Sequence, residues 1–281
     1  MSFIAIVGSG AVGGALAQKL AARSRVAEVR LIDDDESIAR GKALDIAQSA
    51  PIDGFSTRVT AAGTIVAAAG ADAVVIADPA SGGAEHGGEA GLALLRQLTA
   101  IETMAPFVFA GAAQRQLIEH AASELHVPPH RLIGSAPAAL ESALRAMVGL
   151  ALDASGVEVQ LCLVGVPPGA AVVGWEEATA FGQPLAGQLP AHEIAAIARR
   201  IPNLWPPAAY TLASAAARVV EAVAGGSRRR FSCFVALEAG PRREAVAAMP
   251  VVLGPQGIVR IVEPVLTRLE RTALDNALET A

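Results

Sequence analysis

The sequence is poor in aromatic and charged residues. Aromatic residues make up 4% and charged residues 17% of the 281 residues, whereas hydrophobic residues make up 53%. Because a disordered chain needs the opposite balance, disorder is excluded and a large buried core is expected. The net charge of −5 is not accompanied by a long basic run, which argues against a nucleic-acid-binding surface.

Cysteine, histidine and uninterrupted apolar segments are also scarce. Cys162 and Cys233 lie in apolar sequence, and we expect buried free thiols in a cytoplasmic protein. The chain enters a strand at once, without the basic start of a signal peptide. The longest apolar stretch, 159–175, is shorter than a bilayer span and contains Pro167-Pro168, so no membrane span is predicted. The five histidines show no metal-ligand spacing, and no metal site is predicted.

The stretch 159–175, VQLCLVGVPPGAAVVGW, also lacks any group suited to proton transfer. Its only ionisable side chain is Cys162, and it contains no His, Asp or Glu. General acid–base catalysis needs such a side chain within hydrogen-bond reach of the reacting group. This segment therefore cannot supply a conventional catalytic base.

Apolar runs and helical patterns alternate through the first half of the chain. Strands are predicted at 3–7, 29–32, 73–76, 107–110 and 131–133, and helices at 11–23, 37–48, 89–103, 112–125 and 138–152. The second helix is expected to end before Pro51, with Glu36 and Arg40 paired on its surface. Repeated strand–helix units predict an α/β fold, a Rossmann-type doubly wound parallel sheet.

The pattern changes after Asp153 to a mixed α+β arrangement. Strands are predicted at 157–164, 170–175, 178–181, 231–238, 247–253 and 259–262, and helices at 191–201, 207–224 and 266–278. We therefore divide the chain into a dinucleotide-binding domain, 1–145, and a C-terminal domain, 146–281.

A glycine-rich loop follows the first predicted strand. Gly8-Ser9-Gly10-Ala11-Val12-Gly13 fits the pattern G-x-G-x-x-G between a strand and a helix, and Asp33 follows Gly13 by 33 − 13 = 20 residues. The glycines permit a tight turn, close approach of a pyrophosphate and close helix packing, while Asp33 can bind the adenosine ribose. Acidic residues beside Asp33 would repel a 2′-phosphate and favour NAD(H). The residues predicted to bind the cofactor are Gly8, Gly10, Ala11, Val12, Gly13, Asp33 and Asp34. The alternative is that the glycines merely shape a turn.

Longer segments resemble the lactate/malate dehydrogenase family in the family's order. They are GKALDIAQSAP (41–51), LESALR (140–145), YTLASAAARVVEAV (210–223), SCFVALEAG (232–240) and PVVLGPQGIVRIVE (250–263). The resemblance implies a Rossmann half, a catalytic half, NAD(H) as cofactor and assembly as homodimers or homotetramers. In the family the GKALD-type helix lies at a subunit interface.

The catalytic residues that the resemblance implies are replaced here. Such enzymes transfer a hydride between nicotinamide and the carbon bearing a hydroxyl, using a His base oriented by a carboxylate and an Arg that grips the substrate carboxylate. Pro167 stands where the His belongs, and Leu144 where the Arg belongs. Glu141 stands at the place of the orienting Asp. We interpret Glu141 as a surface partner of Arg145, with a catalytic role as the alternative.

The family's mobile loop is also altered. The stretch DPASGGAEHGGEAGLALLR (78–96) has no arginine before Arg96, and the family's Asn-Pro turn is Gly111-Ala112. His86 is the candidate catalytic side chain left in that loop, although a solvated histidine is the simpler interpretation. Asp78 places a carboxylate near the expected cofactor position.

Three hypotheses follow from these replacements. The first is an NAD(H)-binding pseudoenzyme that serves as a binding, sensing or partner subunit. The second is an oxidoreductase acting on an uncharged or apolar substrate in a largely apolar pocket, with His86, Glu141 or Asp78 in new roles. The third is a structural or partner subunit without cofactor.

Overall fold

The computed structural model describes residues 3–81, 83–101, 103–238 and 244–279. The first half contains β1 (Phe3–Val7), α1 (Ala11–Arg23), β2 (Glu28–Ile32), α2 (Glu36–Asp53), β3 (Arg58–Ala62), η1 (Ile65–Ala68), β4 (Ala73–Ile76), α3 (Gly88–Ala100), β5 (Phe107–Phe109), α4 (Arg115–Ser123), η2 (Pro129–Arg131), β6 (Leu132–Gly134) and α5 (Ala136–Ala151). The second half contains η3 (Gly156–Glu158), β7 (Val159–Gln160), β8 (Leu163–Val166), β9 (Ala170–Val173), β10 (Thr179–Ala180), β11 (Gln183–Pro184), η4 (Leu185–Gly187), α6 (Ala191–Ala198), η5 (Ile201–Leu204), α7 (Ala209–Gly225), β12 (Arg230–Glu238), β13 (Glu244–Gly254), β14 (Gly257–Ile261) and α8 (Arg268–Glu279).

One twisted sheet runs through the molecule. Among the described residues it has eleven strands, in the order β3-β2-β1-β4-β5-β6-β12-β13-β8-β9, with β14 beside β13. The first six strands of this order are parallel, with Ile4 opposite Val29 on one side and Ala73 on the other. The chain reverses direction along the sheet between β1 and β4, the point at which doubly wound proteins bind ligands. The predicted Rossmann-type fold class is confirmed.

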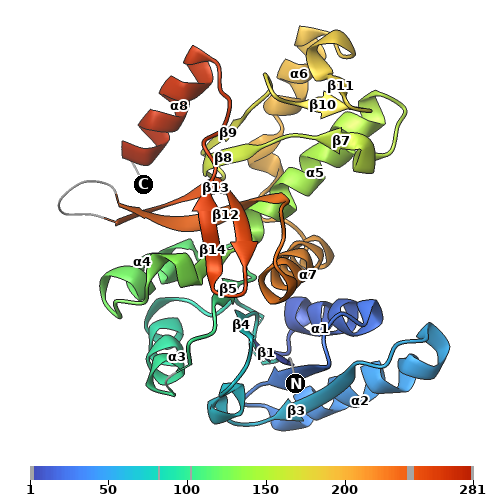
Figure 1. Ribbon diagram of the computed structural model, residues 1–281, viewed down its shortest axis with the longest axis vertical. Coiled ribbons are helices and arrows are strands. Elements are labelled where there is room, and N and C mark those ends of the chain that lie inside the picture. Colours follow the sequence, from blue (N-terminus) through green and yellow to red (C-terminus); the bar gives the residue numbers. More distant parts are fainter. Residues whose placement is uncertain (1–2, 82, 102, 239–243, 280–281) are drawn as a thin grey trace.

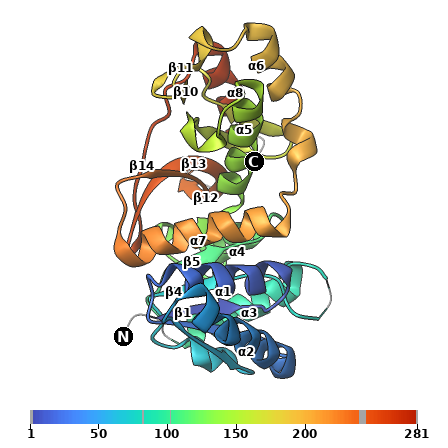
Figure 2. The ribbon, with the colours of Figure 1, turned by 90° about the vertical axis from the view of Figure 1, so that its right-hand side faces the viewer.

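Antiparallel strands extend the same sheet into the second half. β12 pairs with β6 through Phe234 and Gly134, and β13 pairs with β12 and β8. Figure 1 shows this continuity, with β1–β5 in the lower part and β8, β9 and β12–β14 above them. Strands β7, β10 and β11 form a separate three-stranded sheet. Helix α7 packs against α1 where the two halves meet, as both views show (Figures 1 and 2). The predicted division at residue 145 falls inside α5 and remains a prediction.

Close packing where the halves meet depends on small residues. A Cβ at Gly134 would lie 2.7 Å from the Phe234 Cβ, so only glycine fits at that position of β6. The Phe234 ring is buried and meets Trp205 edge to face, with centroids 6.1 Å apart. Such aromatic pairs add to the burial of apolar area. The two halves therefore share one packed seam rather than a loose linker.

Several local expectations can be compared with this fold. The Glu36–Arg40 ion pair is confirmed at 2.7 Å, and both cysteines are buried and free. The predicted end of α2 before Pro51 is wrong. The helix continues to Asp53, because Pro51 is exposed in the last turn and Gly54, with a φ of 74°, makes the terminating bond to Ala50. Strand β3 was not predicted, since RVTAA is short and only partly buried. No helix in the described part of the chain is long and apolar enough to cross a membrane.

Candidate functional site

The glycine loop forms a tight cradle at the carboxyl end of β1. Gly8 has a φ of +102° and donates its amide to the Ile32 carbonyl at 2.8 Å. A Cβ at Gly13 would collide with the Gly8 carbonyl, so α1 can pack this closely only with glycine there. The amides of the first turn of α1 consequently face the open edge of the sheet, where a helix dipole favours an anion.

Asp33 lies at the end of β2 and is held by the chain itself. Its side chain accepts hydrogen bonds from the Ser9 amide (2.7 Å) and hydroxyl (3.0 Å), the Asp35 amide (3.0 Å) and the Ala80 amide (2.8 Å). Burial raises the pKa of Asp33, but these hydrogen bonds outweigh it, so the pKa lies below its ordinary value. Asp33 is therefore an ionised acceptor in the position expected for ribose binding, and Asp34 is exposed beside it.

The Asp78 carboxylate occupies the mouth of the cradle. It follows β4 and accepts hydrogen bonds from the amides of Val12 (2.9 Å) and Gly13 (2.9 Å), the first turn of α1. The Gly10 amide bonds to the Asp78 carbonyl at 2.8 Å. A Cβ at Gly10 would collide with this carboxylate. Asp78 thus provides the N-terminal cap of α1 from 66 residues away in the sequence.

The backbone of the cradle fits a dinucleotide, but in this conformation the Asp78 carboxylate occupies the position of an anion at the start of α1. Gly8, Gly10 and Gly13 leave no room for side chains, and Asp33 stands at the predicted distance along the chain. The Lys42 ammonium contacts the carbonyls of Ser9 and Gly10, the latter at 2.8 Å. A bound pyrophosphate would use the Val12 and Gly13 amides that Asp78 now occupies.

A second carboxylate lies on the turn that follows β5. Glu85 accepts hydrogen bonds from the amides of Ala112 (2.8 Å) and Ala113 (2.7 Å). A Cβ at Gly111 would collide with a Glu85 oxygen. The segment after β4 therefore reaches both the α1 cradle and the β5 turn, on the edge where the parallel strands end. The sequence reading missed Glu85, Ser9 and Lys42, since no local pattern marks contacts that form only in the folded chain.

His86 is not a solvated loop side chain, so that interpretation is wrong. It is half-buried, and its Nε2 atom is buried without a hydrogen-bond partner within the described residues. Burial lowers the pKa of His86, while the carboxylates of Asp33, Asp34 and Asp78 act in the opposite direction. The lowered pKa favours a neutral imidazole, which lies near the carboxylates of the cradle. The structure does not bring it together with Glu141. The charged and polar neighbours of Glu141 are Ser232, Arg145 and Arg230, whereas those of His86 are Asp33, Asp34 and Asp78.

Pro167 lies in the turn between β8 and β9. It is buried, whereas Pro168 and Gly169 are exposed. Its ring offers neither a proton donor nor a proton acceptor. Gly165, two residues earlier, has a φ of +89° and approaches the Ala170 carbonyl so closely that no Cβ would fit. The turn is therefore constrained by its own backbone and exposes no titratable side chain.

Glu141 is the carboxylate carried by α5. It is half-buried, and burial raises its pKa to about 7 against the lowering effect of Ser232, Arg145 and Arg230. The expected surface pair with Arg145 is wrong, because Arg145 instead donates to the Val157 carbonyl at 3.3 Å. A carboxyl group that titrates near neutrality can give or take a proton, which is the property of a general acid or base.

Leu144, at the place where the resemblance expects an arginine, is a residue of the hydrophobic core. It is fully buried in a cluster that includes Leu163 and Val173, so its position faces the packed interior. Arg145, one residue along the helix, points toward η3. Neither position presents a guanidinium that could grip a carboxylate at the β8–β9 turn. Within the described residues, no cluster of three His, Cys, Asp or Glu side chains could hold a metal.

The two thiols are expected to be chemically silent in the folded protein. Burial raises the pKa of Cys162 to about 12, with the charges of Glu141 and Glu177 adding to the effect, and burial also raises the pKa of Cys233. Because the thiolate is the reactive form, neither should react with Ellman's reagent at neutral pH. Both should react once the protein is unfolded in urea. Rapid reaction of a thiol in the folded protein would contradict this expectation.

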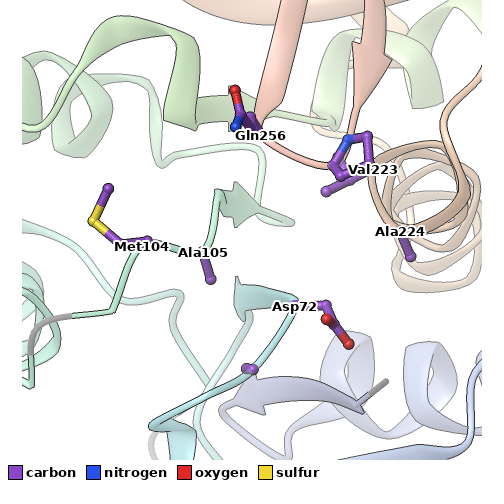
Figure 3. Close-up of a pocket in the computed structure, with 8 residues that line it drawn as sticks. Asp72, Met104, Ala105, Val223, Ala224 and Gln256 are labelled. Atoms are coloured by element: carbon purple, nitrogen blue, oxygen red, sulfur yellow. The ribbon is translucent and has the colours of Figure 1, made fainter. Parts of the chain in front are cut away.

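A pocket lies at the amino ends of β4 and β5, on the opposite edge of the sheet. Asp72 and Ala105, which precede β4 and β5, point toward it from one side, and the end of α7 closes the other (Figure 3). Its lining consists of Ala71, Asp72, Met104, Ala105, Val223, Ala224, Pro255 and Gln256. None of these belongs to the cradle or to the stretch 159–175. The pocket is thus not the apolar ligand pocket expected from the sequence.

Comparison with known proteins identifies relatives of the whole chain. Residues 3–104 match the sequence model described as lactate/malate dehydrogenase, NAD binding domain, and NAD is therefore the cofactor for which this domain is built. Malate dehydrogenase from Thermomicrobium roseum is 30% identical over 291 residues, which cover 96% of this chain and 93% of that protein. Malate dehydrogenase from Chloroherpeton thalassium is 26% identical and covers the same shares.

Solved structures share the fold at lower identity. Malate dehydrogenase from Aeropyrum pernix superposes with a TM-score of 0.88 at 23% identity, covering 99% of this chain and 95% of that one. Lactate dehydrogenase from Cryptosporidium parvum, complexed with lactic acid and NAD, gives 0.87 at 20% identity with the same coverage. The arrangement of both halves is thus that of these enzymes.

Proposed function

Because the chain belongs to the lactate/malate dehydrogenase family, we propose that it is an NAD(H)-binding member that no longer oxidises 2-hydroxy acids. The observation that carries the proposal is Pro167 in the β8–β9 turn, where the resemblance expects the catalytic histidine. Proline cannot accept the hydroxyl proton, and the stretch 159–175 contains no His, Asp or Glu that could replace it.

The arginine that would bind the substrate carboxylate is also missing from the position at which the resemblance expects it. Leu144 is buried in the second-half core, and Arg145 bonds to the Val157 carbonyl. A 2-hydroxy acid would therefore meet an apolar surface instead of a charge-assisted bidentate clamp. Loss of the base and loss of the clamp act on the same step, so their effects reinforce each other.

A binding, sensing or partner-subunit role is what remains for such a protein. NAD(H) would be held by the predicted cofactor residues of the cradle, with Asp33 on the ribose, and a small ligand by the apolar second half. Cytoplasmic placement, with reduced buried thiols, belongs to this proposal. The test is a steady-state assay of malate and lactate oxidation with NAD⁺, and turnover at a rate ordinary for the family would refute it.

The second candidate is an oxidoreductase for an uncharged carbonyl compound. Glu141 favours it, because a carboxyl group with a pKa near 7 is poised for proton transfer at physiological pH. Activity of this kind would rise or fall with an apparent pKa near that value and disappear in Glu141→Gln. A cofactor-free structural subunit is the third candidate, and calorimetry showing no NADH binding at millimolar concentration would favour it.

Assembly into homodimers or homotetramers is part of the proposal. It is supported by large apolar side chains exposed on α2, namely Leu44 (59% exposed) and Ile52 (88% exposed). Leu44→Glu should shift the protein toward monomers in analytical ultracentrifugation, because a charge would then be buried in the interface. Leu269→Glu, on an exposed leucine of α8 (81% exposed), is the control and should leave the assembly unchanged. An unaltered assembly in both variants would place the interface elsewhere.

A further inference from the structure

We infer that the dinucleotide cradle is closed by the chain's own carboxylates, and that Asp78 is the residue that sets its affinity for NAD(H). The inference rests on the part of the proposed function that assigns NAD(H) to this cradle. It starts from the hydrogen bonds of Asp78 to the Val12 and Gly13 amides, both 2.9 Å long. These amides are the donors that a pyrophosphate would use, and two anions cannot share them.

At Asp33, too, a group of the chain occupies a position that the cofactor would need, here on the side of the adenosine ribose. The Ala80 amide donates to Asp33 Oδ2 at 2.8 Å, and that oxygen also accepts from Ser9. A ribose hydroxyl would have to donate to the same carboxylate. Ala80 therefore occupies, with a backbone N–H, one of the positions that a ribose would need.

Glu85 fixes the far side of the segment. Its two oxygens bind the amides of Ala112 and Ala113 beyond β5, one oxygen to each. Asp78 thus binds the turn between β1 and α1, and Ala80 binds Asp33 at the end of β2. Glu85 binds the turn after β5. The three contacts together lie at the carboxyl ends of the parallel strands, beside the switch point between β1 and β4.

The charges at this edge of the sheet oppose the binding of a dinucleotide as long as these contacts persist. Asp33, Asp78 and Glu85 are carboxylates bound to amides, and His86 is held neutral by a lowered pKa. The Lys42 ammonium is engaged with the carbonyls of the glycine loop. NAD(H) can bind only after the Asp78 carboxylate has left the cradle. The free energy needed to displace this carboxylate therefore weakens the binding of NAD(H) by the same amount.

A purely structural role for Asp78, as the cap of α1, is the competing explanation. Both explanations predict that Asp78→Ser lowers the melting temperature of the cofactor-free protein by a few degrees. Only the closed-cradle explanation predicts tighter binding of NADH by the same variant. The dissociation constant therefore separates the two.

The experiment is an NADH titration by fluorescence and calorimetry on the full chain. Asp78→Ser should bind NADH at least ~10-fold more tightly than the wild type, because one ionised competitor of the phosphates is removed. Asp72→Ser, the same substitution at the opposite end of β4, is the matched control and should stay within about twofold of the wild type. Asp78→Asn, which keeps the side-chain shape and one acceptor oxygen, should give a smaller gain and serves if the serine variant does not fold.

The dissociation constants for NADH test the inference, whereas the rates of malate and lactate oxidation test the proposed function. An equal or weaker affinity of the folded Asp78 variants, or no binding by any of them, overturns the inference. Rapid malate or lactate oxidation by the wild type overturns the catalytic part of the proposed function, whatever the ratio of dissociation constants. Tighter NADH binding by the Asp78 variants, together with a wild type that does not oxidise malate or lactate, supports both.

Discussion

Wild-type protein supplied with NAD⁺ and L-malate or L-lactate should form NADH more slowly than about 10⁻² s⁻¹, against roughly 1–10³ s⁻¹ for ordinary enzymes. Loss of a general base alone costs about 10²–10⁴ in rate. Pro167 cannot accept a proton, and Leu144 offers no charge to the substrate carboxylate. The expected rate is accordingly low at any substrate concentration.

The control for this assay is the cofactor itself. NAD⁺ binding must be measured on the same sample, because poor saturation of a closed cradle would also lower the rate. Asp78→Ser, with its expected gain in affinity, removes this ambiguity and should be as inactive as the wild type. A family malate dehydrogenase assayed in parallel verifies the conditions. Turnover of about 1 s⁻¹ or faster by the wild type would show that another group supplies the base.

Glu141→Gln should stabilise the protein at about pH 8 and leave its stability nearly unchanged near pH 5. The pKa of Glu141 is about 7 in the folded chain and 4.5 ordinarily. Between these values the folded state binds the proton that the unfolded state has released, so the free energy of unfolding falls as the pH rises through this window. The full difference is about 3 kcal/mol, as an upper value for a half-buried group.

Urea denaturation at several pH values between about 5 and 8 measures this effect. The glutamine side chain is neutral and of the same shape, so the variant should lack the decline that the wild type shows. Glu158→Gln, on an exposed carboxylate of η3, is the matched control and should follow the wild type. Parallel pH profiles for the wild type and Glu141→Gln would mean that Glu141 titrates at its ordinary value in the folded protein.

The strand–turn–helix cradle could be predicted from the sequence because its signals are local. Gly8, Gly10 and Gly13 serve backbone geometry within a few residues, and Asp33 follows at a spacing set by one helix and one strand. The same locality explains why most helices and strands were placed within a few residues of their observed bounds. The family resemblance extended this from the first half to the whole chain.

The contents of the cradle could not be predicted in the same way. Asp78 was expected near the cofactor, but its bonds to Val12 and Gly13 depend on how β4 is aligned with β1 in the sheet. Glu85 was missed and His86 was misjudged for a related reason, since a Gly-rich segment is expected to be solvated until its tertiary partners are known. Glu141 was assigned to Arg145 from helical spacing, although the fold offers it Ser232.

A single-turnover experiment tests most directly whether an intact nucleotide cradle is combined with a β8–β9 turn that offers no base and an α5 position, Leu144, that offers no guanidinium. Asp78→Ser saturated with NADH is mixed with oxaloacetate or pyruvate, and NADH absorbance is followed over one turnover. The account predicts a constant absorbance while NADH stays bound. Decay of the bound NADH within seconds would contradict it, because hydride transfer would then proceed with Pro167 and Leu144 in place.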